Sequence, residues 1–164
     1  MPDADELARQ LAGRLIEQRL TLALAESCTA GLVADLLAQV SGVSAALWGS
    51  FVCYSPDAKQ RMLGLERDFL ERHGLVSAET AREMAIHARE RAGTSLAAAV
   101  TGIAGPAGDG SGVPVGTVWI AVAWRDQCRE KELHFQGTRA AIRMQAAAAV
   151  FEELLEVLDC LRGA

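Results

Sequence analysis

Apolar and polar positions along the chain switch between helical and strand-like periods. Leucines recur at helical spacing in the acidic-led segment 5–19, which predicts an amphipathic first helix. The short apolar run 21–25 then breaks into small residues, and a second helical pattern covers 32–40. This order predicts a strand, a small-residue turn and a helix.

Capping residues and period-two patterns predict the remaining elements. Ser55-Pro56 is typical of a helix start, because serine caps the first turn and proline fits the first helical position. Ser77 is a similar cap. The sequence predicts strands at 48–54, 95–101, 115–124 and 130–135, and helices at 56–63, 66–72, 78–92 and 138–161.

The order of these elements predicts the fold class. The last two strands form a hairpin around residues 125–127, whereas earlier strands alternate with helices. The alanines of segment 95–101 would also suit a helix, but the glycine-rich loop that follows favours a strand. We predict one domain over residues 1–164 with an α/β fold, a three-layer α/β/α sandwich with a mixed β-sheet.

Composition narrows the class of protein. Of the 164 residues, 51% are hydrophobic and 23% are charged, which argues against intrinsic disorder. The formal net charge of −5 and the absence of a basic run argue against nucleic acid as a partner. The sequence has no long apolar stretch and an acidic N-terminus, so we expect a cytoplasmic protein without a membrane partner. Scattered cysteines and histidines predict no metal site.

The first candidate site is the loop 26–31, which places Ser27, Cys28 and Thr29 between a strand and a helix. Sites in α/β sheets lie beyond the carboxyl ends of strands. Free N–H groups at a helix start can hold an oxyanion, and each such donor contributes about 2.7–4 kcal/mol. Ser27 is preferred as nucleophile over Cys28, because no histidine lies nearby in the sequence. The alternative is that Ser27 and Thr29 only cap the helix.

The second candidate site contains Tyr54, the only tyrosine, and Lys59, one of two lysines in a chain that uses arginine elsewhere. Lysine, unlike arginine, can lose its proton, so Lys59 is a candidate general base. The dipole at the start of a helix contributes only about 0.3–1 kcal/mol to lowering the pKa of a lysine there, which is too little to make it a base near neutral pH. A catalytic Lys59 therefore requires burial or a second cation. The alternative is a solvated lysine on the first turn of a helix.

The third candidate site is the glycine-rich segment 101–110. Its glycines would allow backbone amides to approach a ligand, although the spacing is neither a Walker A nor a Rossmann pattern. The alternative is a flexible surface loop. Arg139 and Arg143 lie one turn apart at the start of the last helix, so they are either an anion clamp or two surface charges.

Five ordered blocks of the sequence resemble the CinA carboxy-terminal family. They are E-S-C-T-A-G at 26–31, Tyr54-Ser55 with Lys59, H-G-L-V-S at 73–77, T-G-I-A-G-P at 101–106 and P-V-G-T-V at 114–118. The resemblance extends from about Leu7 to about Leu158. It implies hydrolysis of the carboxamide of nicotinamide mononucleotide to nicotinate mononucleotide and ammonia, in pyridine-nucleotide salvage. The amino-terminal domain of longer family members is absent from the sequence, so we expect the stand-alone form.

The resemblance also implies roles for individual residues. Ser27 would be the nucleophile, Lys59 the base and Tyr54 a group that orients or relays the proton, without metal or cofactor. The implied substrate-binding groups are the amides of Cys28, Thr29, Ala30 and Gly31 for the oxyanion, and Thr101, Gly102, Gly105 and Arg143 for ribose and phosphate. Ala30 stands where many members of the family have glycine.

Two other functions remain open at this point. The chain could be a catalytically inactive paralogue that binds a pyridine nucleotide and regulates a partner, or an amidase for another small amide. The intact Ser27, Tyr54 and Lys59 argue against the first. Alanine-rich helical faces, such as residues 146–149, favour a homodimer or a larger homo-oligomer.

Overall fold

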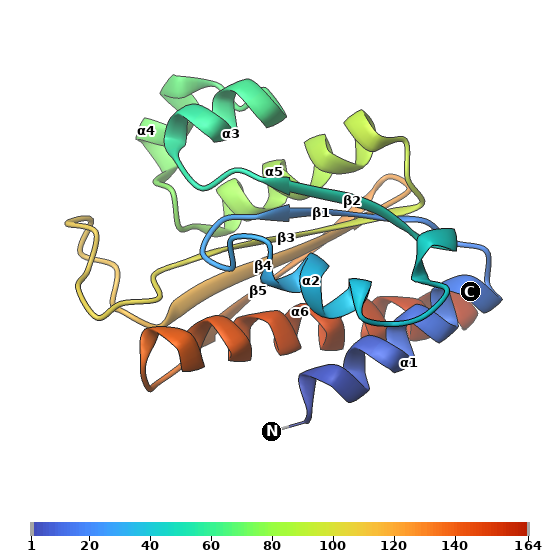
Figure 1. The fold of residues 1–164 in the computed structure, drawn as a ribbon. Helices are drawn as coiled ribbons and strands as arrows, with labels where there is room; N and C mark the ends of the chain where they lie inside the picture. The colour runs from blue at the N-terminus through green and yellow to red at the C-terminus, as the bar shows by residue number, and fades with distance from the viewer. Residues whose placement is uncertain (1, 164) are drawn as a thin grey trace.

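The chain forms three layers, with a β-sheet between two layers of helices (Figure 1). The structure is a computed structural model that describes residues 2–163. The strands are β1 (Leu22–Glu26), β2 (Leu47–Val52), β3 (Leu96–Gly102), β4 (Thr117–Trp124) and β5 (Gln127–His134). The helices are α1 (Ala4–Glu17), α2 (Leu32–Ala38), α3 (Pro56–Leu63), α4 (Arg67–His73), α5 (Ala78–Ala92) and α6 (Arg139–Arg162), with a 3-10 turn at Val43–Ala45.

The sheet is mixed and has the strand order β2-β1-β3-β4-β5. Strands β1, β2 and β3 are parallel, whereas β4 pairs antiparallel with β3 and β5 pairs antiparallel with β4 at one side of the sheet. Helices α1, α2 and α6 cover one face of the sheet, and α3, α4 and α5 cover the other (Figure 1). This arrangement confirms the predicted three-layer α/β/α sandwich with a mixed sheet.

Side chains of different size cover the two faces of the sheet. Successive strand residues point to opposite faces. In β3, Leu96, Ala98 and Val100 pack in the core on the α6 side, whereas Ala97 and Ala99 pack in the core on the α5 side. This period of two explains why the alanine-rich segment is a strand.

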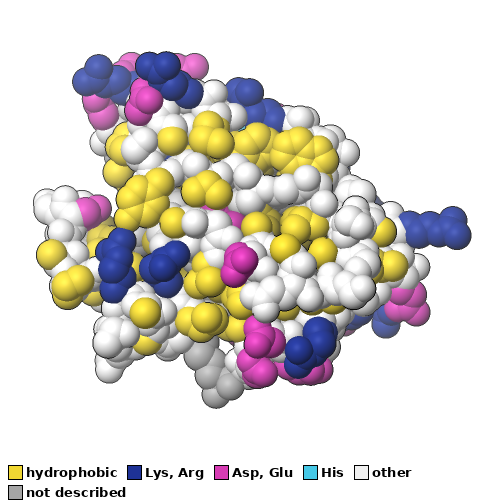
Figure 2. Space-filling view, viewed as in Figure 1, with side chains coloured by type: hydrophobic (Ala, Val, Ile, Leu, Met, Phe, Trp, Pro, Cys, Tyr) yellow, Lys and Arg dark blue, Asp and Glu magenta, His cyan; other side chains and the backbone are white. Residues whose placement is uncertain are grey.

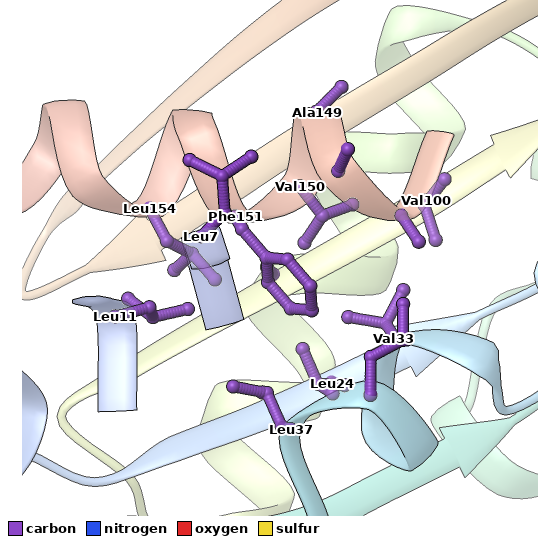
Figure 3. Close-up of a cluster of buried hydrophobic side chains, with 14 of the residues drawn as sticks. Leu7, Leu11, Leu24, Val33, Leu37, Val100, Ala149, Val150, Phe151 and Leu154 are labelled. Atoms are coloured by element: carbon purple, nitrogen blue, oxygen red, sulfur yellow. The ribbon is translucent and has the colours of Figure 1, made fainter. Parts of the chain in front are cut away.

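The larger of the two cores lies between the sheet and α1, α2 and α6. Phe151 of α6 is fully buried there, among leucines and valines of α1, α2 and the central strands (Figure 3). The opposite core is built largely from small side chains, because alanines of the sheet meet alanines of α5. Small facing residues allow close approach of a helix to the sheet.

Several strand boundaries differ from the prediction by up to three residues, including those of β5 and β2. Strand β5 begins at Gln127, after the two-residue turn Arg125-Asp126, and not at residue 130. It is an edge strand with many charged, solvent-facing side chains, so its first residues carry no apolar signal. Strand β2 ends at Val52, so Tyr54 lies in the loop that precedes α3. None of the helices within residues 2–163 has the length and apolar character that crossing a membrane requires.

Candidate active site

Side chains along β1 alternate between the two faces of the sheet, so the neighbouring residues Glu26 and Ser27 point to opposite faces. Glu26 ends the strand and follows the direction of Leu22 and Leu24, toward the α2 side. Ser27 comes next, and its amide donates to the carbonyl oxygen of Val100 at 3.0 Å, which extends the ladder by one residue. The side chain of Ser27 therefore emerges at the carboxyl end of β1 toward the layer of α3.

Helix α3 brings Lys59 beneath Ser27. The side chain of Ser55 caps this helix and Pro56 occupies its first position, as predicted, so Lys59 lies on the first full turn. Lys59 is only 1% exposed. Its Nζ atom lies 2.8 Å from Ser27 Oγ and 3.1 Å from the carbonyl oxygen of Cys53.

The surroundings of Lys59 favour its neutral form. Burial lowers the pKa of this lysine from its ordinary value. Within residues 2–163, no carboxylate lies within 4.0 Å of Nζ to offset that effect. A neutral amine can donate one N–H to Cys53 and accept the Ser27 proton with its lone pair. The arrangement can therefore activate a serine hydroxyl.

Glu26 organises the turn after β1 from the other side. Its carboxylate is fully buried and accepts four hydrogen bonds. The donors are the hydroxyls of Thr29 (2.8 Å) and Ser50 (2.7 Å) and the amides of Val33 (2.8 Å) and Ala34 (3.3 Å). A buried carboxylate that accepts four hydrogen bonds is a structural anchor for the turn.

The predicted start of the second helix at residue 32 is confirmed, so residues 28–31 lie before the helix and not on its first turn. Helix α2 begins at Leu32, and the amides of its first turn donate to Glu26. Residues 28–31 form a turn before the helix, in which the Ala30 amide donates to Ser27 O at 3.1 Å. Among residues 2–163 no acceptor in another residue receives the amides of Cys28 or Thr29. In the described part of the chain these two amides, unlike those of the first turn of α2, therefore have no hydrogen-bond partner.

A cavity of about 210 Å³ opens over the Ser27–Lys59 pair. Its walls come from six places in the sequence: Ser27-Cys28, Tyr54, Lys59, Leu75-Val76, the segment from Thr101 to Asp109, and Arg139. In Figure 1 the carboxyl ends of β1 and β2, the glycine-rich loop and the start of α6 lie at one end of the molecule. Figure 2 shows basic side chains beside apolar ones at that end.

Two arginines one helical turn apart have different contacts. Arg139 lines the cavity and donates to the Tyr54 hydroxyl at 2.8 Å and to the carbonyl oxygen of Gly105 at 2.7 Å. Arg143 lies outside the cavity, where its Nε donates to Cys28 O at 3.0 Å and its Nη2 to Thr29 O at 2.7 Å. Tyr54 therefore contacts Arg139 and makes no hydrogen bond to Ser27 or Lys59.

The structure brings most of the sequence-predicted site residues to one cavity. Those that line it are Ser27, Cys28, Tyr54, Lys59, Thr101, Gly102 and Gly105. The expected binding residues Thr29, Ala30, Gly31 and Arg143 do not line it. Thr29 is buried against Glu26, and the left-handed φ of Ala30 (48°) and of Gly31 (97°) serves the turn into α2.

The glycine-rich loop also has structural contacts. The Thr101 hydroxyl donates to Leu75 O at 2.7 Å, which ties two walls of the cavity together. A Cβ atom at Gly102 would lie 2.8 Å from Thr117 O, so glycine here allows close contact with β4. Sequence reasoning did not assign Leu75 and Val76 to a candidate site, although both line the cavity. They lie in the H-G-L-V-S block, which was the available signal.

Cys28 is unsuited to act as the nucleophile. Burial raises the pKa of its thiol to about 11, so the thiol is protonated at neutral pH. Ser27, by contrast, has a buried amine within hydrogen-bond distance.

Comparison with known proteins gives consistent matches over nearly the whole chain. Residues 4–158 match the model of the CinA C-terminal domain. The chain is 49% identical over 141 residues to a CinA-like protein of Geobacter sp. (strain M21), an alignment that covers 86% of this chain and 34% of that protein. The chain spans about a third of the length of the curated relatives it matches.

Solved structures share the fold over almost their full length. The competence/damage inducible protein CihA from Agrobacterium tumefaciens is 37% identical with a TM-score of 0.91, over 97% of both chains. A CinA superfamily protein from Klebsiella pneumoniae is 33% identical with a TM-score of 0.93, over 96% of this chain and 99% of that one.

Proposed function

The chain belongs to the CinA C-terminal domain family, and we propose that it is a serine amidohydrolase that converts nicotinamide mononucleotide to nicotinate mononucleotide and ammonia. The observation that carries the proposal is the 2.8 Å contact between Ser27 Oγ and the buried Nζ of Lys59. A hydroxyl beside an amine with a lowered pKa is a nucleophile beside its base.

The acylation step follows from this geometry. Neutral Lys59 takes the Ser27 proton while Ser27 Oγ attacks the carboxamide carbon, which gives a tetrahedral oxyanion. The free amides of Cys28 and Thr29 stabilise that oxyanion, and each donor contributes about 2.7–4 kcal/mol. Lys59 then returns the proton to the leaving nitrogen, and the C–N bond breaks to release ammonia and leave an ester on Ser27.

The deacylation step uses the same groups. Lys59, neutral again, takes a proton from water as the water oxygen attacks the ester carbon. The second tetrahedral intermediate collapses, the proton passes to Ser27 Oγ, and nicotinate mononucleotide leaves. Every proton transfer in this cycle runs through one amine, so the scheme needs a lysine that is neutral near physiological pH.

The cavity suggests how the rest of the substrate is held. Its volume of about 210 Å³ is below the roughly 300–1,000 Å³ of typical ligand pockets, so it would hold a small group such as the aromatic amide and not the whole nucleotide. Arg139 lines it and makes no ion pair with a carboxylate of residues 2–163, so its charge is available to the 5′-phosphate. Tyr54 holds the guanidinium of Arg139 at 2.8 Å. We assign Tyr54 to substrate binding and not to proton transfer.

Ammonia release from purified protein tests the proposal. The wild-type protein should release ammonia from nicotinamide mononucleotide, and Ser27→Ala should abolish this turnover while nicotinate mononucleotide still binds. Ser41→Ala, an exposed serine outside the cavity, is the matched control and should keep full activity. Ammonia release that persists in Ser27→Ala would remove Ser27 from its role.

A substrate panel distinguishes the remaining functions. Nicotinamide, its riboside and the dinucleotide should be poorer substrates than the mononucleotide, because only the mononucleotide presents a terminal phosphate to Arg139. Faster turnover of another amide would identify a different amidase. Binding of the mononucleotide without any release of ammonia would identify a regulatory binding protein.

A further inference from the structure

In the turn that carries Ser27, the carbonyl groups of residues 27–29 all accept hydrogen bonds, whereas two of the amides have no partner among residues 2–163. The amides of Cys28 and Thr29 are the free donors beside the nucleophile, since the Ser27 amide itself is used by Val100. In a trans peptide unit, the N–H of one residue points opposite to the C=O of the residue before it. Whatever holds Ser27 O and Cys28 O therefore sets the direction of the two free N–H groups.

Both carbonyls have a partner. Ser27 O accepts the Ala30 amide at 3.1 Å, which fixes the peptide that contains the Cys28 N–H. Cys28 O accepts Arg143 Nε at 3.0 Å, which fixes the peptide that contains the Thr29 N–H. The same guanidinium donates to Thr29 O at 2.7 Å, so it holds two successive peptide units in one orientation.

The hydrogen bonds of Arg143 direct its guanidinium at the backbone of the turn and not at the cavity. It is half-buried, it does not line the cavity, and its two contacts are backbone oxygens of the turn. The peptide N–H groups opposite those oxygens point away from Arg143. Arg139, one turn earlier on α6, is the arginine of the cavity wall.

We propose that Arg143 is a positioning residue that orients the oxyanion-binding amide of Thr29 through Cys28 O, and that it does not bind the substrate phosphate. This inference rests on the proposed function in taking Ser27 as the nucleophile. Because the oxyanion exists only in the intermediate, Arg143 acts on the chemical step and leaves binding of the ground state unchanged.

Kinetics of Arg143→Gln separate this role from phosphate binding. We expect kcat for nicotinamide mononucleotide to fall about 10- to 100-fold, the loss typical of a misplaced catalytic group, with KM within about twofold of wild type. Arg139→Gln should show the opposite effect, a raised KM with a kcat near that of wild type. Arg162→Gln, on the same helix but far from the cavity, is the control for loss of an arginine from α6. A raised KM and an unchanged kcat in Arg143→Gln would overturn the proposal.

A covalent probe tests the same role without the substrate. In a reaction with a fluorophosphonate, Ser27 Oγ forms a bond to phosphorus, the P–F bond breaks, fluoride leaves, and the serine proton passes to Lys59. The phosphoryl oxygen occupies the oxyanion position, so Arg143→Gln should label more slowly than wild type by about the same factor as the loss in kcat. Equal labelling rates in the two proteins would overturn the proposal.

The two experiments fail in different ways. Ser27 labelling that depends on Arg143, without turnover of the mononucleotide, refutes the proposed substrate and keeps the positioning role. Turnover with labelling that is insensitive to Arg143 refutes the positioning role and keeps the function.

Rescue separates positioning from a folding defect. If Arg143→Gln is poorly folded by circular dichroism, Arg143→Ala is assayed with added guanidinium at concentrations below those that unfold the protein. Guanidinium should restore kcat in Arg143→Ala, because it can refill the space and donate to Cys28 O. Failure of both guanidinium and the Arg143→Lys variant to recover any kcat in a folded protein would overturn the proposal.

Discussion

Replacing Lys59 by methionine removes the amine and keeps an unbranched side chain of similar length. The structure gives this change two opposing effects on stability. Cys53 O loses its lysine donor, which costs about 1–3 kcal/mol for a buried acceptor left without a partner. The protein also no longer has to bury an amine that is only 1% exposed and has no carboxylate partner in the described part of the chain.

The pH dependence of the second effect has a definite sign. The pKa of Lys59 is lowered in the folded protein, whereas the unfolded chain keeps the ordinary value of 10.5. Between these two values the unfolded state binds one proton more than the folded state, so the free energy of unfolding rises with pH. At a pH below the pKa of Lys59 in the folded protein, the cost of burying the amine is fully present. At a pH above 10.5, the pKa in the unfolded chain, this cost is gone.

Urea unfolding of both proteins from pH 7 to pH 10 measures this effect. The free energy of unfolding of the wild type minus that of Lys59→Met should rise with pH, with a slope that approaches about 1.4 kcal/mol per pH unit. Lys131→Met is the matched control, because the pKa of that partly exposed lysine is raised by its hydrogen bond to Glu153, and its difference should stay flat in this range. A flat difference for Lys59→Met would show an ordinary lysine and refute the assignment of Lys59 as base. The same variant should lose about 10²–10⁴-fold in kcat.

Three further results are expected. Glu26→Gln should lower the free energy of unfolding by about 1–3 kcal/mol in urea, because its amide nitrogen would face the Ala34 N–H, and an unchanged midpoint would contradict the anchoring role. Ala30→Gly should raise the melting temperature by about 2–4 °C, because glycine adopts the left-handed φ of 48° without the strain of a Cβ, and a lower melting temperature would show that chain entropy dominates. Iodoacetamide at pH 8 should modify the exposed Cys160 but not Cys28, whose pKa is raised to about 11 by burial, and peptide mass spectrometry would reveal modified Cys28 if this were wrong.

Local signals in the sequence were sufficient for most of the fold. The cap at Ser77 and the periodic residues that follow predict a helix over 78–92, which is the range of α5. The order of strands and helices predicts the mixed sheet, because parallel strands need crossovers and a hairpin does not. The start predicted for β5 was too late by three residues, because pairing with β4 sets where this strand begins while its own side chains face solvent.

The site was harder to predict, because helical spacing does not say how far a helix extends past a sheet. Arg139 and Arg143 share one face of α6, and the sequence alone did not show which of them reaches the cavity. The start of α6 beside the glycine-rich loop decides this, and it brings Arg139 to Gly105 O. The resemblance to family motifs made Ser27 and Lys59 candidates, but it did not distinguish the arginine that lines the cavity from the one that holds the backbone.

The neighbouring positions of Glu26 and Ser27 explain how one turn can be both rigid and reactive. A carboxylate on the same face as Lys59 would raise the pKa of the amine and stop it from acting as a base. Because strand residues alternate, Glu26 points to the α2 side and Ser27 to the α3 side, so the carboxylate collects the donors of α2 without contacting Nζ. A one-residue shift in the register of β1 would exchange these two side chains and pair Lys59 with a carboxylate. The period of the strand is therefore as much a condition for the proposed chemistry as the serine and the lysine are.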